Sequence, residues 1–291
     1  MACIGVLALA RPTFDVPFAE ENAARAFEAL DRSGHALVGT RALLFDAAAA
    51  ERAIEAIAAE PIDVLLILQV TFTDASMTVK IAESAEAPLA IWSFPEPRTG
   101  GRLRLNAFCG LNLAAHALGR AGRSFRWLHA APDAPLLDRS LAELLSGTGR
   151  PGQAAGKGRV PSEADRDTAR AVLGKLRGRR IGLVGEHPAG FDTCRFDAGD
   201  LKTLVGIDVE EVALPSLFAR AKAVPADRVA ATKREIGRTM SGLDEVDQPQ
   251  LDKSLSIYRA LEGLARDEGH SAMAVRCWPE MFTDYGCAAC G

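Results

Sequence analysis

Short apolar runs alternate with amphipathic segments along most of the chain. The run CIGVLALA at 3–10 ends at Arg11 and Pro12, as expected of a buried strand that a proline cuts off. Apolar residues at helical spacing follow at 17–33, and Gly34 closes that segment. These residues therefore predict a strand followed by a helix.

The same alternation continues to residue 131. Further strands are expected at 35–45, 63–72, 88–94 and 125–131. Further helices are expected at 47–59, 74–84 and 106–119, the last capped by Asn106. Because strands buried on both faces read as continuous apolar runs, this order predicts a parallel sheet covered by helices on both sides.

A change of composition at 147–162 divides the chain. The stretch GTGRPGQAAGKGRVPS is rich in glycine and basic residues and has almost no large apolar side chain, so we expect a linker there. Beyond it, strands are expected at 179–187, 209–214 and 271–278, and helices at 163–176, 197–205, 226–239 and 248–268. The predicted fold is α/β, with two doubly wound (Rossmann-like or flavodoxin-like) parallel-sheet domains at 1–150 and 163–291.

Composition agrees with a globular protein and narrows its partners. The 291 residues are 48% hydrophobic and 25% charged. The net charge is -4, with acidic and basic residues interspersed, so the sequence predicts no basic surface that could bind nucleic acid. Apolar runs such as VLLILQV at 64–70 are too short to span a membrane, and no basic segment precedes the first run. We therefore expect a cytoplasmic protein that binds neither nucleic acid nor membrane.

Candidate binding residues follow the predicted strands, since ligands of open α/β sheets bind beyond the carboxyl ends of the strands. Arg11 suits a hydroxyl or a carboxylate, and a surface ion pair is the alternative. The stretch 69–74 joins hydrogen-bonding groups to the aromatic ring of Phe72, a mixture suited to a sugar. The alternative for Thr73 or Asp74 is that one of them caps the next helix.

Several kinds of site find little support. The glycines of 97–106 and 181–192 do not have the spacing of a nucleotide-binding loop, and the five histidines have no spacing typical of a helical metal site. The six cysteines are read as reduced thiols, mostly buried. A thiol redox role for Cys287 and Cys290 is a weaker hypothesis, because their C-x-x-C motif lacks a preceding strand.

Four segments together resemble the L-fucose/L-arabinose isomerase family. They are IGVLALARPTFD, PLAIWSFPEPRTGGRLRLNAFCGLN, IGLVGEHPAGFD and AVRCWPEMFTDYGCAACG. The resemblance implies N-terminal and middle α/β domains of an aldose–ketose isomerase that acts through an enediol, with Mn²⁺ or Mg²⁺ polarising the sugar oxygens in the complete enzyme. It also implies a monosaccharide substrate and a homo-oligomer.

The resemblance also implies roles for particular residues. Arg11 stands where the family has an arginine that contacts the substrate, and Phe72 stands near a substrate-facing tryptophan of fucose isomerases. Arg276, Trp278 and Glu280 lie in the segment that brings polar groups to the sugar. The catalytic residues and the three metal ligands of the family, a Glu, an Asp and a His, are expected beyond Gly291, so the 291-residue chain is expected to bind no metal and to be inactive alone.

Two questions stay open at this point. A non-catalytic sugar-binding or sensing module remains the alternative function, since two α/β domains are also the layout of sugar-binding proteins. The sequence leaves open which sugar is bound, and whether it carries an anionic group for Arg98, Arg102 or Arg104.

Overall fold

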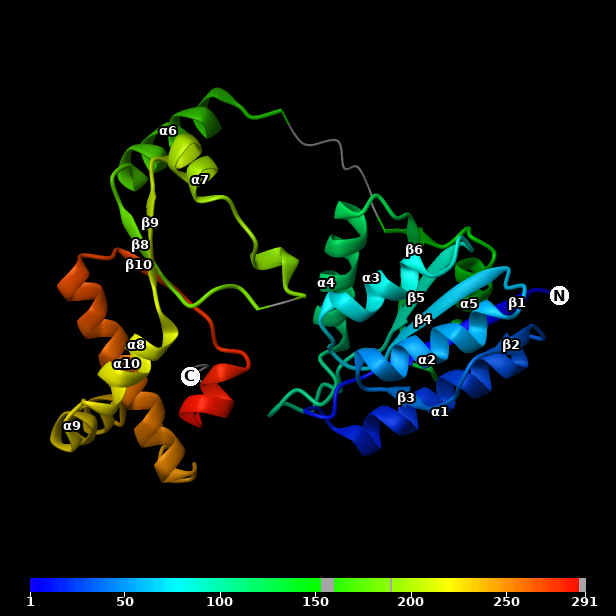
Figure 1. The fold of residues 1–291 in the computed structure, drawn as a ribbon, viewed down its shortest axis with the longest axis horizontal. Helices are drawn as coiled ribbons and strands as arrows, with labels where there is room; N and C mark the ends of the chain where they lie inside the picture. Colours follow the sequence, from blue (N-terminus) through cyan, green and yellow to red (C-terminus); the bar gives the residue numbers. More distant parts are fainter. Residues whose placement is uncertain (153–159, 189, 288–291) are drawn as a thin grey trace. The chain divides into compact units, whose positions relative to one another are not determined.

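The computed structural model describes residues 1–152, 160–188 and 190–287 (Figure 1). Its contacts divide the chain into two compact units. Unit 1 comprises Met1–Lys157 together with Ala189–Thr193, and unit 2 comprises Gly158–Pro188 and Cys194–Gly291. A short segment from the second half of the sequence therefore belongs to the first unit, which the sequence pattern did not indicate.

Unit 1 is built on a mostly parallel sheet of seven strands. The strands are β1 (Cys3–Leu9), β2 (Ala36–Val38), β3 (Leu43–Leu44), β4 (Val64–Gln69), β5 (Leu89–Ser93), β6 (Phe125–His129) and β7 (Arg150–Pro151). Their order is β2-β1-β4-β5-β6-β7, with β3 also paired to β1, and β7 alone runs antiparallel.

Helices cover both faces of this sheet. They are α1 (Val16–Arg32), α2 (Ala47–Ala58), α3 (Ala75–Glu83), α4 (Ala107–Arg120) and α5 (Leu137–Leu145). Alternate residues of β1 enter two separate cores: Val6 packs with residues of α1 and α5, and Leu7 packs with residues of α2, α3 and α4. The strands are thus buried on both sides, which confirms the predicted doubly wound arrangement in this unit.

Unit 2 contains a smaller parallel sheet of three strands. These are β8 (Arg180–Val184), β9 (Asp208–Val212) and β10 (Ala272–Val275), in the order β10-β8-β9. Its helices are α6 (Glu163–Leu176), α7 (Ala198–Val205), α8 (Leu214–Lys222), α9 (Ala226–Ile236) and α10 (Gln248–Glu268). Val184, Leu217 and Ile257 lie in its core, and single helical turns occur at Asp192–Cys194, which spans the boundary of the units, and at Met281–Tyr285.

Most expected elements are present, and the differences have physical causes. The strand expected at 35–45 is interrupted because Gly39 has a φ of 118° and passes so close to the carbonyl of Val6 that a Cβ would lie 2.4 Å from it. Helix α8 begins at Leu214, where a strand was expected to end, and its early Pro215 suits a first helical turn.

The register of the sheet in unit 1 fixes which residues share its carboxyl edge. Leu9 of β1 is paired with Gln69 of β4, Gln69 with Ser93 of β5, and Ser93 with His129 of β6. The strands therefore end level, and the residues that follow them emerge at one edge.

Candidate functional site

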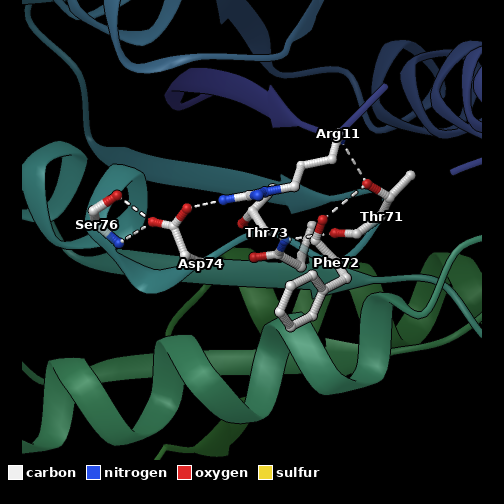
Figure 2. A network of polar contacts seen from close by, with 7 residues as sticks. Arg11, Thr71, Phe72, Thr73, Asp74 and Ser76 are labelled. Carbon is white, nitrogen blue, oxygen red and sulfur yellow. Dashed lines mark hydrogen bonds and ion pairs between the residues drawn. The ribbon is translucent and has the colours of Figure 1, made fainter. Parts of the chain in front are cut away.

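Arg11 emerges at this edge, directly beyond β1. Its backbone N–H donates to Thr71 Oγ1 at 2.8 Å, and its guanidinium donates to the carboxylate of Asp74 (Figure 2). The side chains of Arg11 and Asp74 are only 21% and 14% exposed. The guanidinium is therefore held in one direction at the carboxyl end of the sheet.

Asp74 also caps helix α3. Its Oδ1 accepts the backbone N–H of Ser76 at 3.0 Å and the Ser76 hydroxyl, as Figure 2 shows. The capping interpretation is thus confirmed for Asp74, and the ion-pair interpretation is confirmed for Arg11.

The other polar groups of 69–73 are used inside the protein. Gln69 Nε2 donates to the carbonyl of Thr71 at 2.7 Å and to Thr73 Oγ1 at 2.9 Å. All three side chains are buried. These hydrogen bonds shape the end of β4, while the buried Oε1 of Gln69 has no hydrogen-bond partner among the described residues.

Phe72 is half-buried in an aromatic cluster at the same edge. Its ring centroid lies 6.2 Å from that of Phe14 and 5.6 Å from that of Phe191, which belongs to the segment that returns to unit 1. Its backbone N–H donates to the carbonyl of Leu105 at 2.7 Å. Arg11 and Phe72 therefore share one edge, while their contact with a substrate stays a prediction.

A serine–histidine pair at this edge was not found from the sequence. Ser93 Oγ lies 2.7 Å from His129 Nδ1, and the ring of Phe108 packs 4.9 Å from that of His129. Burial lowers the pKa of His129, so the neutral ring is favoured at physiological pH. The signal that places the two residues together is the strand register, which no local motif reveals.

In unit 2, Arg276 follows β10 and forms a bidentate ion pair with Glu280. Its Nε and Nη2 donate to the two carboxylate oxygens of Glu280 at 2.7 and 2.5 Å. Arg276 Nη1 also donates to the carbonyl of Glu186, beyond the end of β8, at 3.4 Å. This bidentate pair fixes Arg276 at the carboxyl edge of the second sheet.

A cavity of about 560 Å³ opens at that edge. Four carboxylates and one guanidinium line it, beside apolar residues such as Phe218: Glu186, Glu211, Glu280, Asp284 and Arg276. Its charged lining is thus mostly acidic. Such a lining suits hydroxyl groups, which donate hydrogen bonds, better than an anion.

Trp278 lies between Arg276 and Glu280 in the sequence and packs at the same turn. Its ring meets that of Phe282 edge-on at 5.5 Å, and a cis peptide bond joins Trp278 to Pro279. The three expected substrate-binding residues of unit 2 are therefore held within one turn of chain. Their contact with a sugar stays a prediction.

The described residues do not fit a metal site. No three His, Cys, Asp or Glu side chains approach closely enough within the described ranges to hold a metal ion. The carboxylate of Glu280 is already engaged by Arg276. The Mn²⁺ or Mg²⁺ expected by resemblance is therefore not assigned to these residues.

The cysteines give no support to a redox site. Of the five described, Cys287 is buried and the others are half-buried or exposed, so the expectation of mostly buried thiols is wrong. Burial raises the pKa of Cys287, which disfavours the reactive thiolate. Cys290 lies outside the described residues.

Among the described residues, no helix has the length and apolar character needed to cross a membrane.

Comparison with known proteins identifies the family. The fucose/sulfoquinovose isomerase N-terminal domain matches residues 5–146, which lie within unit 1. Sulfoquinovose isomerase of Alkalicoccus urumqiensis is 30% identical over 230 residues, which cover 79% of this chain and 47% of that protein. Sulfoquinovose isomerase of Priestia aryabhattai is 26% identical over 282 residues, which cover 97% of this chain and 58% of that protein.

A third relative, the sulfoquinovose isomerase of Clostridium sp. (strain MSTE9), is 26% identical over 228 residues, which cover 78% of this chain and 46% of that protein. The chain thus spans about half the length of the curated relatives it matches. These matches confirm the resemblance expected from the sequence, and the chain belongs to the fucose isomerase-like family.

Proposed function

We propose that this chain forms part of an aldose–ketose isomerase that acts on a hexose. The observation that carries the proposal is its similarity, over 79% to 97% of its length, to proteins named sulfoquinovose isomerase. Sulfoquinovose is a glucose whose C6 carries a sulfonate in place of the hydroxyl. A sugar of this kind is the substrate we propose.

The proposed role of the described residues is to bind and orient the sugar. Arg11 is held by Asp74 at one carboxyl edge, and Phe72 offers an apolar surface nearby. In unit 2, Arg276 and Glu280 border a cavity that also contains other acceptors for hydroxyl groups. A sugar has apolar ring faces and a polar rim, so such mixed surfaces suit it.

The chemistry needs more than these residues. Aldose–ketose interconversion moves a proton between adjacent carbons through an enediol, and a divalent metal would stabilise the negative charge that develops on the two oxygens. Because the described residues hold no fitting cluster, we propose that Mn²⁺ or Mg²⁺ and the proton-transfer groups lie in the part of the enzyme that this chain does not span. The role left to Arg11 and Arg276 is positioning of the hydroxyl groups.

The enzyme is further proposed to work as a homo-oligomer in the cytoplasm. Light scattering coupled to size-exclusion chromatography measures the assembly: a mass that is a multiple of the protomer supports it, and a monomer at working concentration contradicts it.

A non-catalytic sugar-binding module is the second candidate. One observation favours it: the described residues contain a cavity at a sheet edge, lined by carboxylates and one arginine that can bind hydroxyl groups. The two candidates differ in whether the bound sugar is changed. Nuclear magnetic resonance of sulfoquinovose separates them when the sugar is incubated with Mn²⁺ and the full protein, meaning this chain together with the part of the enzyme that it does not span. An isomerase converts part of the sugar to its ketose, and a module leaves it unchanged.

A further inference from the structure

The loop between β5 and α4 is pinned at its base by a single carboxylate. Glu96 accepts the backbone N–H groups of Leu105 and Asn106 at 3.0 and 2.9 Å, and also that of Arg104. Pro95 and Pro97 flank Glu96 and stiffen the chain on either side of it. The seven residues between Glu96 and Arg104, 97–103, therefore form a loop whose two ends are held together by Glu96.

Three arginines of this loop were candidates for an anion, and the structure separates them. Arg104 is engaged: its Nε donates to Asp15 at 2.8 Å, and its guanidinium lies 3.7 Å from the centroid of the Phe18 ring. The hydrogen bond from Arg104 lowers the pKa of Asp15 and keeps that carboxylate charged. Arg104 therefore anchors the loop to α1 and leaves ligand binding to the other two.

Arg102 is directed toward the strand end that carries Arg11. Its Nη2 donates to the carbonyl of Thr13 at 2.8 Å, two residues beyond Arg11. The backbone N–H of Asp15 also donates to the carbonyl of Arg104 at 3.0 Å, so the segments 11–15 and 102–104 run side by side, as Figure 1 shows for the start of α1 and the loop before α4. The loop therefore borders the edge at which Arg11 emerges.

Arg98 lies on the other arm of the loop and is unengaged. The turn between Arg98 and Arg102 uses Gly100 and Gly101, both with a positive φ, of 72° and 76°. Arg98 is exposed, and no hydrogen bond or ion pair joins its guanidinium to any residue in the described ranges. A loop held at its base by Glu96 thus carries the unengaged guanidinium of Arg98 and that of Arg102, which contacts the segment after Arg11.

We propose that Arg98, assisted by Arg102, binds the anionic substituent of the substrate, a sulfonate or a group of the same charge and shape. This inference rests on the proposed function and adds the residues that select for the charged sugar. A sulfonate is ionised at every physiological pH and offers three acceptor oxygens, which the planar donors of arginine match.

The charge distribution within each unit supports this assignment. The cavity of unit 2 is lined by four carboxylates against one arginine, which disfavours an anion there. The edge of unit 1 has four arginines, Arg11, Arg98, Arg102 and Arg104, against the carboxylates Asp15, Asp74 and Glu96. Asp15 and Asp74 are paired with arginines and Glu96 with backbone N–H groups, so the surplus positive charge falls on Arg98 and Arg102.

The test compares sulfoquinovose with quinovose, which is 6-deoxyglucose and lacks only the sulfonate. Isothermal titration of the full protein measures Kd for both sugars in the wild type and in Arg98→Gln, Arg102→Gln and Arg98→Lys. Arg52→Gln is the matched control, because Arg52 is an exposed residue of α2 outside the loop and this variant removes the same charge.

We expect the wild type to bind sulfoquinovose about tenfold or more tightly than quinovose, as one charge-assisted contact allows. Arg98→Gln should remove most of that ratio without changing Kd for quinovose, Arg102→Gln should remove part of it, Arg98→Lys should retain part of it, and Arg52→Gln should leave it intact.

If Arg98→Gln keeps the wild-type ratio of Kd for quinovose to Kd for sulfoquinovose, the inference is overturned and the proposed function still stands. A wild type that isomerises neutral aldoses and shows no preference for the sulfonate overturns the inference as well. Absence of any sugar conversion by the wild type refutes the proposed function itself.

Discussion

The guanidinium of Arg11 is paired with the same carboxylate that caps helix α3, that of Asp74. One oxygen of Asp74 accepts the arginine, and the other accepts the backbone N–H and the hydroxyl of Ser76. A candidate substrate contact is thereby tied to the start of a helix, so stability and substrate orientation depend on one side chain.

Replacement of Asp74 tests this connection. Asp74→Ala removes the cap and leaves Arg11 without this partner, so we expect the free energy of unfolding of unit 1 to fall by about 1–3 kcal/mol. Ser76→Ala is the control: it keeps the backbone N–H that Asp74 accepts and loses only a hydroxyl, so its loss should stay below about 1 kcal/mol. Urea-induced unfolding measures both, and equal losses in the two variants would contradict this account.

Two glycines in helices should respond to alanine in opposite ways. A Cβ on Gly110 of α4 would lie 2.8 Å from Nε2 and 3.0 Å from Cδ of Gln69, whose side chain is buried and hydrogen-bonded. Because Gln69 has no room to move, we expect Gly110→Ala to destabilise unit 1 by about 1–3 kcal/mol.

Gly174 of α6 is the matched position, because a Cβ there meets nothing within 4 Å. Gly174→Ala should stabilise unit 2 by up to about 1 kcal/mol through helix propensity alone. Thermal and urea unfolding of both variants check the signs, and a stabilised Gly110→Ala would show that the packing of Gln69 against α4 is wrong.

Acid should weaken unit 2 through Glu210. Its carboxylate accepts from His270 Nε2 at 2.6 Å and from Arg180 Nη1 at 3.0 Å, and these partners, His270 first, lower the pKa of Glu210. A carboxylate with a lowered folded-state pKa contributes stability above its unfolded value of about 4.3, and this stability is lost as the pH falls through the lowered pKa.

Glu210→Gln should therefore be less stable than the wild type at neutral pH, and the difference should shrink below about pH 4.3. Glu211→Gln is the control, since the neighbouring Glu211 is exposed and its side chain has no hydrogen bond or ion pair among the described residues. Urea unfolding at a series of pH values measures both variants, and a difference for Glu210→Gln that does not change with pH would contradict the prediction.

The pair of Arg276 and Glu280 should show measurable coupling. Their side chains are 22% and 27% exposed and form two hydrogen bonds, so we expect a coupling energy of about 1 kcal/mol. A double-mutant cycle of Arg276→Gln and Glu280→Gln measures it from unfolding free energies. Additive losses would mean that the pair does not hold Arg276 in place in solution.

Much of the fold could be predicted from the sequence, because buried parallel strands leave continuous apolar runs such as that of 63–72. The return of Phe191 to unit 1 could not, since it depends on contacts with residues far away in the sequence. Helix α5 was missed because it is short and follows Leu136, which has a positive φ that no sequence signal marked.

The candidate site could be predicted only in part. Arg11, Phe72 and Arg276 were selected because they directly follow apolar runs or match family segments, and their contact with a substrate stays a prediction. The pairing of Arg11 with Asp74, and of Ser93 with His129, depends on strand order and register, which the sequence does not contain locally. The difference between Arg98 and Arg104 likewise depends on the position of Asp15 and Phe18.

The most direct test of the central claim is proton exchange during sugar conversion. The full protein, supplied with Mn²⁺, is incubated with sulfoquinovose in heavy water, and nuclear magnetic resonance follows the ketose signals and the hydrogen at C2. The predicted result is conversion to the ketose, with deuterium at C2 of the recovered aldose. In Arg11→Gln, the rate of this conversion should fall at least about tenfold. Sulfoquinovose that binds yet keeps its C2 hydrogen and forms no ketose would contradict the isomerase and favour a sugar-binding module.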